Sequence, residues 1–485
     1  MTPLCETVTG RSMAELLAAR DAAVTGDMVE LRLDGVADLD VARALAGRHL
    51  PAVVTCRAAW EGGQFDGTEE ERRAVLAAAL DFGAEFVDVE WPAVEGQATA
   101  VPFRDLVRRK PERIVVSSHD FQGVPADLEA RARAMRATGA ATIKIAVSIE
   151  RLSQMRCLKA IAQDGPAVVI GMGELGVTSR LLAGRFGSRW TYAGNGVAPG
   201  QLPVRRMIDD YGFRRIHDST RIFGVVSTNA LHSLSPVMHN AAFQGAAIDA
   251  VYVPLPAEDF ADFLTFAADM GVEGLSVTIP FKRDALRAAE SASALTRQVG
   301  AANTLRRRSG GWEAANTDVD GFLQPLASAW VGSLEGVRAS VLGAGGAARA
   351  VVVALASKGA RVTIHARREE QARELAEDFD VQVGSYPPAP ASWDLLVNCT
   401  PAGSAARRLE SPMPSDRLTG RLVYDLTYRP GESALLRDAR VAGVASLDGL
   451  AMLVAQAERQ FEWWTGQHPG LGVMEAAARR RVATT

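Results

Sequence analysis

The sequence predicts an α/β protein: an N-terminal (β/α)8 TIM barrel followed by a two-lobed α/β unit that contains a Rossmann dinucleotide-binding lobe. Three observations lead to this prediction. Eight β-rich runs alternate with amphipathic helical patterns over the first 215 residues. The same alternation restarts after residue 221. A glycine-rich turn then stands between an apolar strand and a helix near residue 345.

The composition is that of an ordinary globular protein. The chain has 485 residues, 48% hydrophobic and 23% charged, which excludes disordered, collagenous and disulfide-scaffold classes. With a net charge of −4 and no apolar run of membrane-spanning length, we expect no nucleic-acid or membrane partner. The N-terminus has no secretory signal pattern, which predicts a cytoplasmic location. The four cysteines lack metal-ligand spacing, so we expect free thiols and no metal site.

The barrel prediction depends on eight strands with helices between them. The helical patterns are clearest at Glu69–Phe82, Ala126–Thr138 and Ile149–Gln163. The predicted strands are Leu4–Thr9, Met28–Leu33, Ala52–Arg57, Phe86–Glu90, Ile114–Ser118, Thr142–Val147, Ala167–Met172 and Trp190–Ala193. In such barrels the chemistry occurs at the carboxyl ends of the strands. Here those ends carry Glu30, Arg32, Arg57, Asp88, Glu90, Ser117, Ser118, His119, Lys144 and Met172.

Lys144 is the most informative of these residues. Only five of the 53 basic residues are lysines, and this one lies within the apolar strand sequence ATIKIAV. Burial of an unpaired ammonium is costly, so we expect a neutral amine that could form a Schiff base. The alternative is an ion pair with a rim carboxylate such as Glu90. His119, one strand earlier, could transfer protons, and Arg57 and Arg180 could bind a carboxylate.

The second half begins after a short polar junction, Asp209–Thr220. Expected elements are a strand at Ile222–Val226, a helix entered through Leu231–Asn240, a strand at Ala250–Val253 and a helix near Phe260–Met270. Lys282 follows a strand and a proline, which predicts a strand end or loop. We divide the chain into a barrel (1–215), a substrate-binding lobe (221–322 plus 449–485) and a nucleotide-binding lobe (323–448).

The nucleotide-binding prediction depends on the sequence SVLGAGGAARA. Gly343, Gly345 and Ala348 fit the G-x-G-x-x-[G/A] pattern between a strand and a helix. Backbone amides at Gly343, Gly345, Gly346 and Ala347 would bind a pyrophosphate. The following strand ends in His365-Ala-Arg367-Arg368 rather than in the acidic residue typical of NAD sites. Arginines suit a 2′-phosphate, so we predict NADP.

The first half resembles type I 3-dehydroquinate dehydratase. The motifs ELRLD, TCR, EGG, VDVE, SSHDF, KIAV, GVTSR and APGQ occur in order. The resemblance implies that Lys144 forms the imine, that His119 is the general acid and base, and that Glu30, Arg32, Arg57, Glu61, Arg180 and Gln201 bind substrate. Val197 stands where the family often has serine, which affects one loop contact.

The second half resembles shikimate dehydrogenase. It contains HSLSP, SVTIPFK, GAANTL, NTDVDG, GAGGAARA, NCTPAGS, YDLTYRP and DGLAMLVAQAERQFEWWTG. The resemblance implies a catalytic pair, Lys282 and Asp318, with Tyr428 beside the site. Ser233, Ser235, Thr278, Asn303 and Gln456 would bind substrate, the serines contacting its carboxylate. Ser276 replaces an asparagine common in bacterial members.

Together the resemblances imply a bifunctional enzyme, a lyase and an NADP-dependent oxidoreductase. It would dehydrate 3-dehydroquinate to 3-dehydroshikimate and reduce that product to shikimate, in aromatic amino acid biosynthesis. Two alternatives stay open. The second half could act mainly as a quinate dehydrogenase, since specificity is a difference in transition-state binding. The chain could also be a non-catalytic regulator of the quinate pathway. Such a regulator should have lost its reactive groups, whereas this chain keeps all four of them: Lys144, His119, Lys282 and Asp318.

Overall fold

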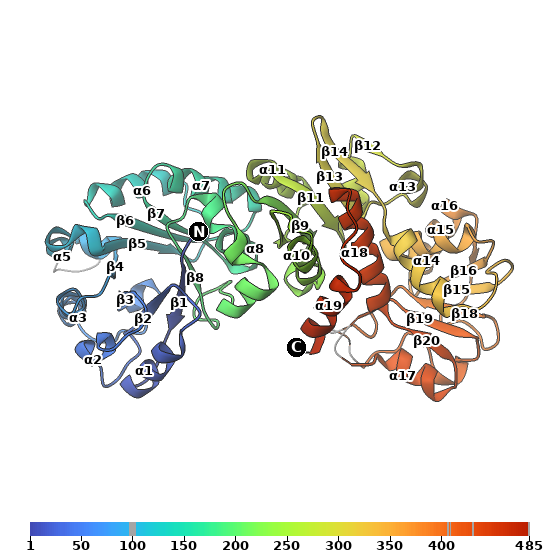
Figure 1. Ribbon diagram of the computed structural model, residues 1–485, viewed down its shortest axis with the longest axis horizontal. Helices are drawn as coiled ribbons and strands as arrows, with labels where there is room; N and C mark the ends of the chain where they lie inside the picture. Colours follow the sequence, from blue (N-terminus) through green and yellow to red (C-terminus); the bar gives the residue numbers. More distant parts are fainter. Residues whose placement is uncertain (97–102, 405–406, 408, 429–430, 484–485) are drawn as a thin grey trace. The chain divides into compact units, whose positions relative to one another are not determined.

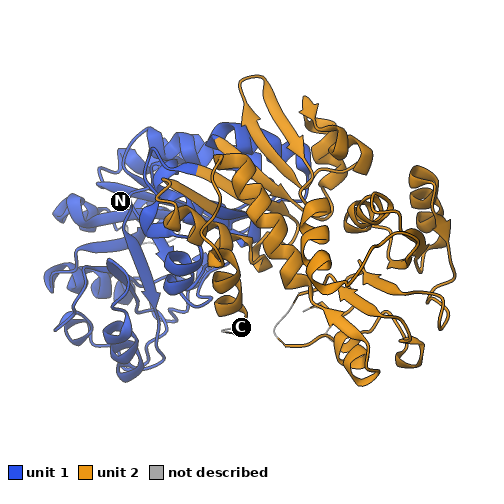
Figure 2. Ribbon diagram, turned by 45° about the vertical axis from the view of Figure 1, so that its right-hand side comes forward, with its two compact units in different colours: residues 1–221, 253–271 blue, residues 222–252, 272–485 orange. Residues whose placement is uncertain are grey.

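The structure, a computed structural model, describes residues 1–96, 103–404, 407, 409–428 and 431–483. Arg429 and Pro430, which end the YDLTYRP motif, lie outside the described residues. The chain divides into two compact units (Figure 2). Unit 1 consists of Met1–Arg221 and Val253–Gly271, and unit 2 of Ile222–Tyr252 and Val272–Thr485.

Unit 1 contains the eight-stranded parallel sheet that the sequence predicted (Figure 1). The strands pair in the order β7-β6-β5-β4-β3-β2-β1-β8, and buried side chains such as those of Val53, Val115 and Trp190 fill the interior. The strands are β1 (Leu4–Val8), β2 (Met28–Arg32), β3 (Ala52–Thr55), β4 (Phe86–Glu90), β5 (Ile114–Asp120), β6 (Thr142–Ser148), β7 (Ala167–Met172) and β8 (Thr191–Ala193). Each lies within a few residues of its predicted range, because parallel strands buried on both faces appear as short apolar runs.

Helices surround this sheet. They are α1 (Met13–Ala22), α2 (Val41–Leu45), α3 (Glu69–Asp81), α4 (Trp91–Glu95), α5 (Arg104–Arg109), α6 (Leu128–Ala137), α7 (Met155–Gln163), α8 (Gly173–Leu181) and α9 (Ala183–Phe186). A capping box formed by Thr68 and Glu71 fixes the start of α3. The helix predicted from Ile149 begins later, at Met155. Before it, the Gln154 side chain accepts hydrogen bonds from the backbone N–H groups of residues 150 and 151 and holds a turn there.

The polar junction packs against the barrel. Tyr211 and Phe213 are buried, and Arg214 pairs with Asp27 at the amino end of β2. Helix α11 (Phe260–Met270) also belongs to unit 1.

Helix α11 makes polar contacts with the segment that enters and forms α7. The Ser153 backbone N–H donates to Asp262 at 3.3 Å, Arg156 pairs with Asp269 at 2.8 Å, and Lys159 donates to the Asp269 carbonyl at 2.7 Å.

The rest of the chain forms two six-stranded sheets. The first has the order β10-β9-β11-β13-β14-β12, with β9 (Arg221–Ser227), β10 (Ala250–Pro256), β11 (Val272–Val277), β12 (Ser291–Ala292), β13 (Thr304–Arg308) and β14 (Gly311–Ala315). The second is parallel, with β15 (Arg338–Leu342), β16 (Arg361–His365), β17 (Gln382–Val383), β18 (Leu395–Asn398), β19 (Leu422–Asp425) and β20 (Ala445–Leu447). Its order, β17-β16-β15-β18-β19-β20, is that of the predicted Rossmann fold.

Several helices of the second half begin at or next to predicted site residues. The helices of this part are α10 (Ser235–Gly245), α12 (Lys282–Ala288), α13 (Ala294–Val299), α14 (Asp318–Ala329), α15 (Gly346–Ala356), α16 (Glu369–Phe379), α17 (Ala434–Val441), α18 (Gly449–Thr465) and α19 (Val473–Ala483). Lys282 therefore begins a helix, whereas we expected it at a strand end or in a loop. Among the described residues, no helix combines the length and apolarity that a membrane crossing requires.

Candidate active sites

A cavity of about 300 Å³ opens at the carboxyl ends of the barrel strands. All eight residues that the sequence assigned to the first site line it: Glu30, Arg32, Arg57, Glu61, His119, Lys144, Arg180 and Gln201. Its other lining residues include Thr7, Phe121, Tyr192 and Val197. The side chains that the predicted chemistry requires therefore share one pocket.

Lys144 is buried in β6 and its amine is paired. Its Nζ atom lies 3.0 Å from Asp88 Oδ2, 3.7 Å from Glu30 Oε1 and 4.4 Å from the ring centre of Tyr192. The expectation of an unpaired amine is therefore wrong, because two carboxylates lie 3.0 and 3.7 Å from the Nζ atom. The alternative partner, Glu90, is also not the one found, since that carboxylate is held by two arginines.

His119 and Glu61 form a hydrogen-bonded pair beside this amine. Glu61 Oε1 accepts from the His119 backbone N–H and lies 2.8 Å from His119 Nδ1. Burial raises the pKa of Glu61 to about 8. Burial, together with Arg57 and Lys144, lowers the pKa of His119. The imidazole is therefore neutral at pH 7, and if Nδ1 carries the hydrogen, Nε2 is the proton acceptor.

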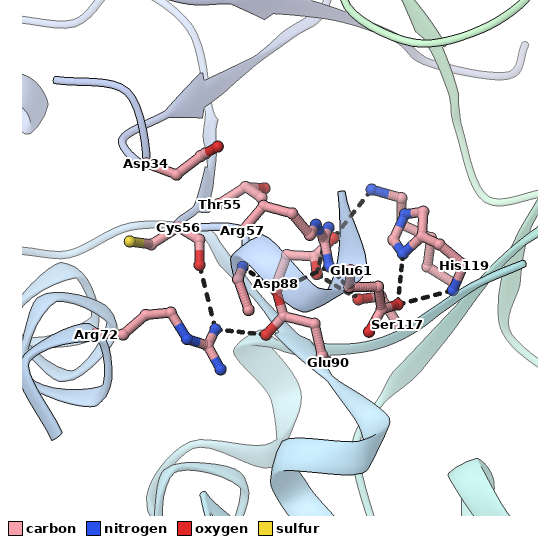
Figure 3. Close-up of polar contacts among 12 residues, drawn as sticks. Asp34, Thr55, Cys56, Arg57, Glu61, Arg72, Asp88, Glu90, Ser117 and His119 are labelled. Atoms are coloured by element: carbon pink, nitrogen blue, oxygen red, sulfur yellow. Dashed lines mark hydrogen bonds and ion pairs between the residues drawn. The ribbon is translucent and has the colours of Figure 1, made fainter. Parts of the chain in front are cut away.

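Arg57 is fixed by three acceptors (Figure 3). It donates through NH1 to Glu90 Oε1 at 3.0 Å and to Ser117 Oγ at 2.8 Å, and it pairs through NH2 with Asp88 Oδ1 at 2.9 Å. Burial alone would lower the pKa of Arg57, but Asp88 and Glu90 raise it above its ordinary value. Arg57 is thus a permanently charged, oriented group in the cavity wall.

Arg180 and Gln201 approach the cavity from outside the strands. Arg180 lies in α8 and donates to the Tyr192 and Pro199 carbonyls at 3.4 and 3.1 Å, and burial lowers its pKa to about 10. Gln201 donates to Thr7 Oγ1 at 2.9 Å. Among the described residues Arg180 Nε is buried without a hydrogen-bond partner, so it can donate to an anionic ligand.

The sequence interpretation missed several supporting groups. The sequence places Asp88 at a strand end without predicting a role for it, although Asp88 and Glu90 alternate with apolar residues and so face the barrel interior. Thr7 and Thr55 each donate to Glu30 at 2.8 Å, one to each carboxylate oxygen. The period-two pattern of each strand was the signal that could have identified these residues.

Lys282 and Asp318 form the centre of a second site, in unit 2. Lys282 is the first residue of α12, and Asp318 is the first residue of α14. Lys282 Nζ lies 2.5 Å from Asp318 Oδ2. The Asn303 amide donates to Asp318 Oδ1 at 2.8 Å and lies 3.4 Å from Gln456 Oε1. The structure thus assembles four of the predicted residues into one polar group, in which Asp318, Asn303 and Gln456 are buried and Lys282 is partly buried.

The predicted serines lie at the start of α10. Ser233 Oγ accepts from the Ser235 backbone N–H at 3.1 Å. A hydrogen-bonded network that sequence reasoning did not find lies beside Ser235: Tyr252 donates to Ser276 Oγ at 2.5 Å, and Ser276 donates to Gln460 Oε1 at 2.6 Å. The remaining predicted residue, Thr278, directly follows β11, and its backbone N–H donates to the Val226 carbonyl at 3.2 Å.

The glycine-rich turn borders a cavity of about 220 Å³, lined by Lys282, Gly345, Gly346 and Arg349 among others. Helix α15 begins here without a side-chain cap, so its first amides are free of side-chain acceptors and suit a phosphate. A Cβ atom at Gly346 would lie 3.1 Å from Lys282 Cδ. Gly343 has φ of +104° and lies against residues 399 and 400. These features fit a dinucleotide.

The two predicted arginines, Arg367 and Arg368, follow β16 and are exposed, Arg368 being the residue before α16. They are not among the residues that line the 220 Å³ cavity. Because neither is buried, their guanidinium groups could reach a 2′-phosphate in solvent-accessible space.

Comparisons with known proteins match the two halves of the chain to different families. Residues 4–218 match the type I 3-dehydroquinase family. Residues 225–305, 325–405 and 449–479 match, in turn, the shikimate dehydrogenase substrate binding domain, the shikimate/quinate 5-dehydrogenase family and the shikimate 5′-dehydrogenase C-terminal domain. A chloroplastic bifunctional 3-dehydroquinate dehydratase/shikimate dehydrogenase of Arabidopsis thaliana is 34% identical over 476 residues, covering 91% of this chain and 78% of that protein. This chain belongs to the bifunctional 3-dehydroquinate dehydratase/shikimate dehydrogenase family.

Single-function relatives match the second half. An NADP(+) shikimate dehydrogenase of Methanocella arvoryzae is 41% identical over 270 residues, 53% of this chain and 98% of that protein. A solved shikimate dehydrogenase in complex with NADP+ superposes with a TM-score of 0.52 at 29% identity, over 55% of this chain and 97% of that one. The Aquifex aeolicus shikimate dehydrogenase gives a TM-score of 0.50 at 32% identity, over 54% and 99%. The predicted fold class and family are confirmed.

Proposed function

We propose that this chain catalyses two consecutive reactions of the shikimate pathway. The barrel dehydrates 3-dehydroquinate to 3-dehydroshikimate, and the second half reduces that product to shikimate with NADPH. The proposal is carried by the assembly of both reactive pairs: Lys144 and His119 line one cavity of the barrel, and Lys282, which lines the cavity at the glycine-rich turn, lies 2.5 Å from Asp318.

In the first reaction the Lys144 amine condenses with the substrate ketone and releases water. Asp88 and Glu30 are the carboxylates nearest to this amine, and they orient it toward the cavity. The iminium acidifies the adjacent C–H bond, and neutral His119 takes that proton. His119 then protonates the departing hydroxyl, which leaves as water, and hydrolysis of the iminium restores the amine.

In the second reaction NADPH supplies the hydride. Lys282 donates a hydrogen bond to the reacting carbonyl oxygen and, with Asp318, delivers the proton that converts it to a hydroxyl. Ser233 and Ser235 donate to the substrate carboxylate, while Asn303, Thr278 and Gln456 contact ring hydroxyls. The backbone amides of Gly345, Gly346 and Ala347 hold the pyrophosphate, whereas the Gly343 N–H donates to the His365 carbonyl and Gly343 shapes the turn. Arg367 and Arg368 hold the 2′-phosphate.

The test is a coupled assay with one protein: 3-dehydroquinate and NADPH are supplied and shikimate is measured. Lys144→Met should abolish dehydration and the borohydride-trapped adduct while reduction of added 3-dehydroshikimate continues. Lys282→Met should lower reduction by orders of magnitude while dehydration continues. Loss of both activities in either variant would contradict two independent sites.

We propose that the product of the second reaction is shikimate rather than quinate. Turnover of both acids, measured with NADP and with NAD, tests this choice. Faster oxidation of quinate than of shikimate would favour the quinate dehydrogenase alternative.

Free thiols at Cys5, Cys56, Cys157 and Cys399 support a reducing compartment such as the cytoplasm, whereas the Arabidopsis relative is described as chloroplastic.

A further inference from the structure

A second layer of charge lies behind Arg57 in the barrel wall (Figure 3). Glu90, at the end of β4, is fully buried and uses its two carboxylate oxygens on different partners. Oε1 accepts from Arg57 NH1 at 3.0 Å and from the Ala58 backbone N–H at 3.3 Å. Oε2 accepts from Arg72 NH1 at 2.5 Å. Glu90 therefore joins an arginine of the cavity to an arginine that does not line it.

Arg72 is fixed by burial, by hydrogen bonds and by an aromatic ring. It lies in α3 with none of its surface exposed. Its NH1 also donates to the Cys56 carbonyl at 3.1 Å, and its NH2 donates to Glu69 at 2.7 Å. Its guanidinium carbon lies 4.7 Å from the ring centre of Phe103. Because Cys56 directly precedes Arg57, Arg72 holds both the backbone that leads to Arg57 and the carboxylate that orients its side chain.

Stability alone does not explain this arrangement. A buried ion pair can often be replaced by apolar side chains of similar volume without loss of stability, because burial removes the hydration of both charges. An apolar residue against Phe103 would satisfy the packing. The alternative reason for keeping a buried charged network is that it fixes geometry, which groups that bind substrate require to within fractions of an ångström.

We propose that Arg72 is a positioning residue for the dehydratase reaction: through Glu90 and the Cys56 carbonyl it holds Arg57 in its substrate-binding orientation. This inference depends on the proposed role of Arg57 in binding 3-dehydroquinate. Arg72 touches neither the cavity nor the substrate, so its effect is transmitted by Arg57.

The experiment measures dehydratase kinetics of the full chain with Arg72→Met, Arg57→Lys and the double variant. Arg72→Met should lower kcat/KM about tenfold or more, mainly through KM, because misplacement of a binding group by about 1 Å is enough for such losses. Dehydrogenase kinetics should not change. In the Arg57→Lys background, Arg72→Met should add less than about twofold, since residues that act through one another are not additive.

The matched control is Arg73→Met, on the same helix. Arg73 pairs with Asp105 at the surface and has no contact with Glu90, so its kinetics should match those of the unmodified protein. An unchanged KM in Arg72→Met, or multiplicative effects in the double variant, would overturn the inference. If Arg57→Lys alone leaves KM unchanged, the role of Arg57 fails as well, and this outcome separates the two proposals.

Glu90→Gln provides a second route if Arg72→Met does not fold. The glutamine oxygen can accept from only one of the two arginines on opposite sides, because its NH2 group would face the other donor. The same rise in KM, and the same loss of effect in the Arg57→Lys background, are expected. Normal KM in a folded Glu90→Gln protein would refute the proposal independently.

Discussion

Glu61→Gln should change how barrel stability depends on pH. Burial raises the pKa of Glu61 from its ordinary 4.5 to about 8, so the folded state keeps a proton that the unfolded state releases. Because the folded state then binds more protons, stability falls as the pH rises from about 4.5 to about 8. Glutamine has the same shape and does not titrate, so the variant lacks this loss.

The magnitude follows from the two pKa values. At about 1.4 kcal/mol per pKa unit, the full difference between 4.5 and about 8 corresponds to about 5 kcal/mol. Between pH 5.5 and pH 8.5 the linkage relation gives about 3 kcal/mol of this loss. The free energy of unfolding of Glu61→Gln, measured relative to that of the unmodified protein, should therefore increase by about 3 kcal/mol over that interval, which means that the variant becomes relatively more stable.

The assay must report on the barrel alone. Urea unfolding at pH 5.5, 7.0 and 8.5, followed by pulsed hydrogen–deuterium exchange of peptides from β4 and β5, meets this need. Glu70→Gln, an exposed position on α3, is the control and should follow the unmodified protein at each pH. A stability difference between Glu61→Gln and the unmodified protein that stays constant with pH would refute the assignment of a protonated Glu61.

Two further predictions concern the dehydrogenase half. Arg367→Ala with Arg368→Ala should raise KM for NADPH about ten- to hundredfold and leave KM for NADH unchanged, because charge-assisted hydrogen bonds contribute about 1.5–3 kcal/mol each; equal effects on both cofactors would contradict a 2′-phosphate role. Gly346→Ala should lower kcat/KM for reduction about tenfold, since its Cβ would lie 3.1 Å from Lys282 Cδ, whereas Gly245→Ala has nothing within 4 Å of its Cβ and should behave normally.

Much of the barrel site could be predicted because each strand carries its own signal. Lys144 stands out as a lysine in an apolar strand, and His119 and Arg57 follow apolar runs. The ion-pair partner of Lys144 could not be identified in the same way. Asp88 and Glu90 are both inward-facing on β4, and only the three-dimensional positions of Arg57 and Arg72 decide which carboxylate is available to the amine.

The dehydrogenase site shows the same limit more strongly. The glycine-rich turn and the two arginines are local patterns, and local patterns can be interpreted from sequence. Within the network of Tyr252, Ser276 and Gln460, the hydrogen bond from Ser276 to Gln460 joins residues 184 positions apart, so no spacing rule connects them. The family resemblance supplied Lys282 and Asp318, whose contact at 2.5 Å depends on the placement of two helix starts.

The packing of α11 within unit 1 bears on how this protein can be dissected. A gene fragment ending near residue 215 would supply every lining residue of the dehydratase cavity, yet it would lack 253–271 and leave Ser153, Arg156 and Lys159 without their acceptors. A fragment starting near residue 221 would contain α11 without α7, so the α11 side of the same contact would be exposed. Expression of either half by itself therefore removes a native interface, and a chain cut near residue 215 or 221 is a truncated molecule rather than a free-standing enzyme.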